Sequence, residues 1–200
     1  MVGFEIFPLV SFLILIFMIL GRVVFLKRKG VKISAAGNET VKTSPFSYPV
    51  FLLIMLLWLW EISKPVFQIS FSVLPETITQ LLFHSVFIQI AGVMIIAISL
   101  VIMLLTLLHF RNSLRFGLVE NNIGKLIITG IFAFSRNPFF TSLILWFTGI
   151  ALVFPSPFFV GFALLAATGI HFFILKEEKF MQRFYGSEYL EYRRKVRRYF

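Results

Sequence analysis

The chain contains no cysteine, which excludes disulfide bonds, thiolate metal sites and a cysteine nucleophile. Charge is also scarce, since 14% of the 200 residues are Asp, Glu, Lys or Arg and 58% are hydrophobic. No charged residue occurs between Glu76 and Arg111, or between Arg136 and Lys176. A spanning helix needs roughly 20 apolar residues, so each run can hold at least one. The composition therefore predicts an integral membrane protein and not a soluble domain.

The familiar catalytic signatures are missing as well. The sequence has no HExxH motif, no recognisable Ser-His-Asp pattern, no phosphate-binding loop and no dinucleotide fingerprint. His84 and His109 fall near opposite ends of one predicted helix, so they cannot share a metal ion. No metal site is predicted.

Positive charge is present in excess, with a net charge of +10. All Lys and Arg residues except Lys64 lie in three clusters, at 22–42, 111–136 and 176–198. Basic residues gathered in short loops mark the cytoplasmic side of a membrane protein and attract anionic lipid headgroups. Because no nucleic-acid-binding module accompanies the charge, nucleic acid is not an expected partner. We expect the N-terminus outside and the C-terminus in the cytoplasm.

The hydrophobic runs predict an all-α, polytopic membrane protein with about five transmembrane helices. The first three spans are expected at about 5–25, 48–73 and 81–109, and a helical hairpin at 137–175 supplies the last two. The hairpin should turn at "PSP", residues 155–157. The tail from Met181 onward alternates aromatic and basic residues at helical spacing, which predicts an amphipathic helix at the membrane interface.

A few polar residues lie within or beside these spans. Glu61 and Lys64 are three residues apart, so a local ion pair is favoured over an inter-helix pair or a substrate contact. Glu177 and Glu178 follow the last uncharged run; they are either solvated at the interface or positioned to bind a ribose diol. His171 should share a helix face with Glu178, as a partnered core residue or as a catalyst.

Arg136, Asn137 and Pro138 form the most unusual stretch, "FAFSRNPFF", just before the predicted hairpin. Together with "GKLIITG" before it and "KEEKFMQRFYGSEYLEYRRKVRRYF" forty residues later, it resembles the isoprenylcysteine carboxyl methyltransferase family and the related phospholipid methyltransferases. The resemblance covers about residues 105–200. It implies a catalytic region at 105–200 preceded by three membrane helices within 1–104.

The resemblance implies S-adenosylmethionine as methyl donor, bound in a cytoplasmic pocket and partly enclosed by the tail. The acceptor would be a lipophilic molecule such as an isoprenoid, a prenylcysteine or a phospholipid. Cofactor contacts carried over by position are Gly124, Lys125, Leu126, Ile127, Phe132, Asn137, Pro138, Phe139, Phe140 and Glu177. Residues expected on the substrate side or in the pocket wall are Arg136, His171, Phe173, Glu178 and Tyr189.

Five positions depart from the family pattern, and two of them are Asn137, where His is usual, and Leu114, where Trp is frequent. Phe132 and Phe140 stand where Tyr is usual, so they can pack but cannot donate a hydrogen bond. Phe173 stands where an Arg linked to substrate handling is usual. Two alternatives to the methyltransferase remain open. One is an NADPH-dependent membrane reductase of related fold, and the other, which the substituted Tyr and Arg positions favour, is a non-enzymatic lipid-binding scaffold.

Overall fold

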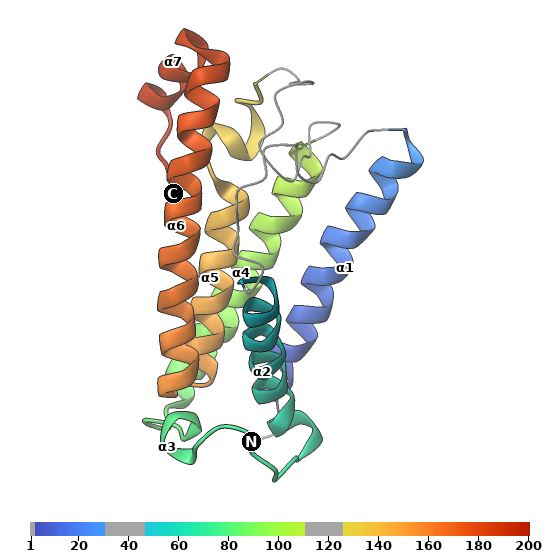
Figure 1. The fold of residues 1–200 in the computed structure, drawn as a ribbon, viewed down its shortest axis with the longest axis vertical. Helices are drawn as coiled ribbons and strands as arrows, with labels where there is room; N and C mark the ends of the chain where they lie inside the picture. Colours follow the sequence, from blue (N-terminus) through green and yellow to red (C-terminus); the bar gives the residue numbers. More distant parts are fainter. Residues whose placement is uncertain (1–2, 31–46, 111–125) are drawn as a thin grey trace.

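The computed structural model describes residues 3–30, 47–110 and 126–200 (Figure 1). Within these ranges the chain is all-helical and has no β-strand. The α-helices are α1 (Ile6–Arg28), α2 (Ser47–Phe67), α3 (Glu76–Thr79), α4 (Val86–His109), α5 (Pro138–Val153), α6 (Pro157–Tyr185) and α7 (Ser187–Lys195), and a 3-10 turn η2 covers Gly130–Ala133. The predicted all-α class is confirmed.

Among the described residues, three helices are long and apolar enough to cross a membrane, namely α1, α4 and α6. Helix α5 is apolar but has 16 residues, and α2 has 21. These five helices occupy the five predicted segments, and the break between α5 and α6 falls at the predicted "PSP". That all five cross the bilayer remains a prediction.

Two predicted boundaries are wrong by several residues. Helix α2 ends at Phe67 and not at 73, because Gln68 adopts a positive φ of 53°, a left-handed conformation that commonly terminates helices. Helix α4 begins at Val86 and not at 81. The preceding segment is held instead by the α5–α6 turn, where Leu82 N donates to Pro155 O at 2.7 Å.

The α5–α6 turn is shaped by its capping residues. Pro157 occupies the first turn of α6, where its missing N–H has no helical acceptor to lose. The Ser156 hydroxyl caps the same helix by accepting from Phe159 N at 3.3 Å. The two helices therefore run antiparallel. The SRNP turn (residues 135–138), which leads into α5, thus lies at the same end of the molecule as the acidic pair Glu177 and Glu178 near the end of α6 (Figure 1).

The core lies where α4 packs along α5. Gly92 and Gly149 allow the two backbones to approach closely, because a Cβ on Gly92 would lie 2.7 Å from Gly149 O. Around this contact Ile96, Met103 and Ile150 are buried. Trp146 ties α1 to this core, since its Nε1 donates to the buried Ser11 hydroxyl at 2.9 Å.

Large apolar side chains also cover the outside of the helices. Phe17 on α1 is 78% exposed and Phe87 on α4 is 85% exposed. Such a surface is unfavourable in water and suits lipid. Inside the helical body Lys64 Nζ lies 3.1 Å from Glu61 Oε2, so the predicted local ion pair is confirmed.

Helix α6 extends past its apolar run and then turns back. It has 29 residues, or about 43 Å at 1.5 Å per residue, against a hydrocarbon core of about 30 Å. Residues from Lys176 to Tyr185 therefore project beyond the membrane-spanning part. Gly186, with a φ of 53°, ends the helix. The chain continues as α7, and its last residues return along α6 (Figure 1).

Candidate functional site

The SRNP turn and the acidic pair meet at the end of the helix bundle, although they are forty residues apart in sequence. Arg136 Nη2 lies 2.7 Å from Glu178 Oε1, and Asn137 Nδ2 donates to the same oxygen at 3.3 Å. Arg198 approaches the other oxygen, with Nη2 2.9 Å from Oε2. The Glu178 side chain is 6% exposed and the Arg136 side chain 7%. Glu178 is therefore a buried carboxylate held between two guanidinium groups.

The same turn fastens the C-terminal segment. Arg136 Nη1 donates to Val196 O at 2.7 Å and to Arg193 O at 3.1 Å, while Arg136 N donates to Arg197 O at 2.9 Å. Arg198 O accepts from the Ser135 hydroxyl at 3.2 Å. We refer to Arg136, Asn137, Glu178 and Arg198 as the tail clamp, because they join the start of α5, the end of α6 and the C-terminal segment.

Electrostatics explain why Glu178 stays ionised. Burial acts to raise its pKa, but the hydrogen bonds from Arg198 and Arg136 outweigh burial, and the pKa lies below its ordinary value. A buried carboxylate is tolerated when it is paired and hydrogen-bonded in this way. The clamp is therefore a permanently charged unit at neutral pH.

Glu177 has the opposite environment. It is partly buried, and it makes no hydrogen bond or ion pair within the part of the chain that the structure describes. Burial, together with the neighbouring Glu178 charge, raises the pKa of Glu177 to about 7. An unpartnered acid with a shifted pKa is a candidate ligand-binding group.

Aromatic side chains lie on the same side of α6 as Glu177. Phe173 precedes Glu177 by one helical turn and so lies on the same side. The Phe140 ring, from the first turn of α5, packs against Phe173 with ring centroids 5.3 Å apart. The structure thus brings three predicted site residues together on one flank of α6, which we call the Glu177 flank.

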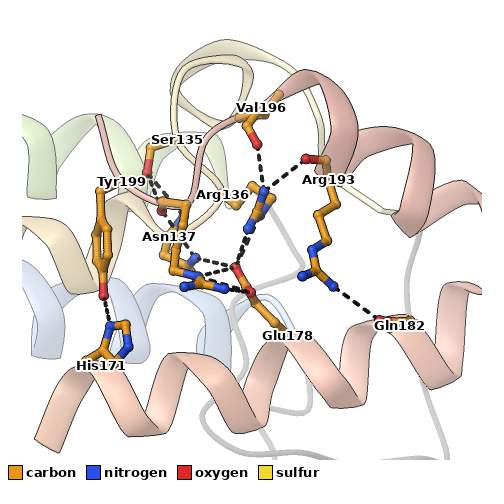
Figure 2. Close-up of polar contacts among 10 residues, drawn as sticks. Ser135, Arg136, Asn137, His171, Glu178, Gln182, Arg193, Val196 and Tyr199 are labelled. Atoms are coloured by element: carbon orange, nitrogen blue, oxygen red, sulfur yellow. Dashed lines mark hydrogen bonds and ion pairs between the residues drawn. The ribbon is translucent and has the colours of Figure 1, made fainter.

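The remaining predicted residues have different surroundings. His171 shares the tail-facing side of α6 with Glu178, as predicted, and its Nδ1 lies 2.7 Å from the Tyr199 hydroxyl (Figure 2). Tyr189 is buried, and burial raises its pKa to about 12. Pro138 is fully buried at the first turn of α5, and Phe139 packs against Phe140 with centroids 5.4 Å apart.

The segment leading into the SRNP turn is described from Leu126 onward. Leu126 and Ile127 are partly buried, and Phe132 is buried in η2 with its ring 5.1 Å from that of Phe110. The Phe132 carbonyl accepts from the Tyr192 hydroxyl at 2.6 Å. The other two expected cofactor contacts, Gly124 and Lys125, lie outside the described residues.

Sequence reasoning missed the structural partners of the tail. Arg198, Tyr192 and Tyr199 each contact a predicted site residue, yet none was given a role. A usable signal was present: an ionised carboxylate at a span end needs a cation, and the basic cluster at 176–198 supplies eight. It could not indicate which cation, because that depends on how the chain turns at Gly186.

A comparison with protein-family models matches residues 87–188 to the family described as phospholipid methyltransferase. The match covers just over half of the chain and runs from the first turn of α4 to the first turn of α7. The chain belongs to the phospholipid methyltransferase family. Searches of curated proteins and of solved structures gave no significant match. The matched region contains the SRNP turn and both acidic residues of α6, so the family assignment and the geometry concern the same part of this membrane protein.

Proposed function

We propose that this protein transfers a methyl group from S-adenosylmethionine to a lipophilic acceptor at the cytoplasmic face of the membrane. The observation that supports this most is that the continuous family match at 87–188 contains both the SRNP turn and the acidic pair, which the fold joins through the Arg136–Glu178 ion pair. The structural role of the clamp leaves Glu177 as the carboxylate with hydrogen-bonding capacity to spare. The donor site is therefore assigned to the Glu177 flank.

The residues on this flank fit the donor. The Glu177 carboxylate can accept two hydrogen bonds from a ribose diol, and the Phe140 and Phe173 rings offer apolar faces to an adenine. The first helical hydrogen bond at the start of α5 runs from Thr141 N to Asn137 O. The Phe140 N–H, earlier in that turn, has no intrahelical acceptor and suits the donor's carboxylate.

Asn137 is expected from the sequence to contact the donor directly, and we propose an indirect role for its side chain. Its side-chain amide donates to Glu178 and to Arg198 O, both at 3.3 Å, so it belongs to the clamp in this structure. We propose that it orients the turn from which Pro138, Phe139 and Phe140 contact the donor. Leu126, Ile127 and Phe132 would line the same pocket from the preceding segment, while Gly124 and Lys125 remain predicted contacts.

Positioning and water exclusion are the main tasks of the protein groups. The bound donor supplies an electrophilic methyl group on a positively charged sulfur. Neutralisation of that charge during transfer favours an apolar, dry site over one rich in titratable groups. An ionised oxygen acceptor needs no base, whereas an amine or alcohol acceptor must lose a proton. The acceptor is expected to enter from the bilayer, because the helices expose large apolar side chains to lipid.

Transfer of label from the donor to lipid tests the proposal. The full-length protein in nanodiscs is incubated with methyl-labelled S-adenosylmethionine and a total lipid extract, and the organic phase is analysed. We expect a labelled lipid with the wild type and none with Glu177→Ala, while Glu188→Ala, an exposed carboxylate on α7, behaves as wild type. No labelled lipid from the wild type would contradict the proposal, and oxidation of NADPH in a parallel assay would favour the reductase.

A further inference from the structure

A second candidate site lies on the side of α6 that faces away from Glu177. Lys179, Gln182 and Arg183 line an open hollow of about 490 Å³. With about 100° of rotation per residue, Lys179 lies about 200° and Arg183 about 240° round the helix axis from Glu177. The hollow is therefore separate from the Glu177 flank, and none of the described residues that we assign to the donor lines it.

Among the described residues, the charge that lines this hollow is positive and has no acidic partner. Lys179 and Arg183 are exposed, and neither forms an ion pair among the residues that the structure describes. Gln182 accepts from Arg193 Nη1 at 3.4 Å, which brings a third cation to the edge (Figure 2). Glu178 cannot neutralise these groups, because Arg136 and Arg198 already occupy both of its oxygens.

The depth of the hollow matches the lipid headgroup layer. The uncharged run of α6 covers residues 157–175, which is about 28 Å at 1.5 Å per residue, close to the thickness of a hydrocarbon core. Lys179 follows about 6 Å beyond that run and Arg183 about 12 Å beyond it. Long basic side chains at this depth reach back toward the interface. Phosphate is the anion present there.

From these observations we infer that Lys179, Gln182 and Arg183 form a docking site for the phosphate of an anionic phospholipid. Lys179 and Arg183 are four residues apart and so project from one face of the helix, where both can contact one phosphate. The Gln182 amide adds a neutral hydrogen-bonding group beside them. The bound lipid would lie against the flank of α6 opposite the donor site, as a companion of the fold and not as the methyl acceptor.

Retention of single lipid molecules tests this site. Full-length protein in detergent is mixed with a low molar ratio of phosphatidylglycerol, and bound lipid is counted by native mass spectrometry. We expect the double variant Lys179→Gln/Arg183→Gln to bind on the order of tenfold more weakly than wild type. The matched control Arg194→Gln/Lys195→Gln removes the same charge from exposed positions of α7 outside the hollow and should bind as wild type.

The other outcomes would overturn the inference. Equal losses in both double variants would mean general charge attraction, and no loss in either would mean that the hollow binds no lipid. Equal binding of the free headgroup, glycerophosphoglycerol, would indicate a soluble ligand instead. Because the hollow lies opposite Glu177, binding of S-adenosylhomocysteine should be unchanged in both double variants. The lipid experiment therefore tests the docking site independently of the methyltransferase proposal.

Discussion

At the scale of single residues, the adjacent carboxylates of α6 have different tasks. Glu178 is buried, ionised and bonded to Arg136, Asn137 and Arg198. Glu177 is partly buried, unpartnered within the described residues, and has a pKa raised to about 7. The difference arises from rotation round one helix, since neighbouring residues point about 100° apart.

Replacing each carboxylate by glutamine should therefore affect stability differently. Glu178→Gln leaves the buried Arg136 guanidinium without its counter-charge, and we expect a loss of about 3 kcal/mol or more, measured as a lower midpoint of thermal unfolding in detergent at pH 8. Glu177→Gln should leave the midpoint unchanged or raise it. Since the pKa of Glu178 is lowered, its contribution is present above the ordinary value of 4.5 and is lost as the pH falls below it. Equal midpoints for the two variants would contradict the assigned roles.

Donor binding should depend on the ionisation of Glu177. Its carboxylate accepts hydrogen bonds when ionised, and its pKa is raised to about 7, so binding should tighten as the pH rises through 7. We expect the Kd of S-adenosylhomocysteine to be about tenfold higher at pH 6 than at pH 8, following the ionised fraction. Glu177→Gln should bind weakly with no such dependence. A wild-type Kd that does not change over this pH range would argue against Glu177 as a donor-binding residue.

At the scale of elements, α6 carries residues of all three candidate sites, and the contact between α4 and α5 fixes the position of α5 beside it. The tail clamp, the Glu177 flank and the hollow lined by Lys179, Gln182 and Arg183 occupy different sides of the projecting end of α6. The position of the SRNP turn beside that end depends on α5, which is held against α4 by the close approach at Gly92 and Gly149.

The glycine contact can be tested with a matched pair of alanine variants. In Gly92→Ala the new Cβ would lie 2.7 Å from Gly149 O and 2.9 Å from Val153 N, both backbone atoms. We expect destabilisation of about 1–3 kcal/mol, seen in thermal unfolding. Gly169→Ala on α6 meets nothing within 4 Å and should be neutral or stabilising by about 0.5–1 kcal/mol. A tolerated Gly92→Ala would mean that α4 and α5 are less tightly packed.

Helical spacing predicted much at this scale. It placed Glu61 beside Lys64 and His171 on the side of Glu178, and both placements hold. The proline pair located the α5–α6 turn for the same local reason. The ends of α2 and α4 were misplaced, because Gln68 adopts an uncommon conformation and Leu82 bonds to the distant Pro155. Neither effect can be predicted from hydrophobic periodicity.

Contacts made by the tail were the least predictable part. The Arg136–Glu178–Arg198 arrangement joins three segments, and its form depends on the reversal at Gly186. The spacing of the basic residues in the tail is compatible with several partners for Glu178. The aromatic side of α7 also differs from a free membrane-facing surface, since Tyr189 and Tyr192 are buried against the protein. Its place at the interface remains a prediction.

At the scale of the whole molecule, the arrangement implies an orientation in the membrane. The SRNP turn, the clamp and α7 lie at one end of the bundle, while α3 and the start of α1 lie at the other (Figure 1). Basic residues dominate the first end, which should therefore be cytoplasmic.

Single cysteines can report this orientation, because the natural chain has none. In right-side-out vesicles, an impermeant maleimide should label Ser70→Cys, in the exposed segment after α2, without permeabilisation. Ser187→Cys, exposed at the start of α7, should react only once the membrane is opened. The unaltered chain provides the background control. The reverse labelling pattern would invert the proposed topology and place the donor site outside.

The central claim is that the Glu177 flank binds the adenosyl donor, and calorimetric titration with S-adenosylhomocysteine tests it most directly. The account predicts micromolar binding by the detergent-solubilised wild type. Binding should be lost in Glu177→Ala and retained in Glu188→Ala. Absence of binding by the wild type, or undiminished binding by Glu177→Ala, would contradict the account.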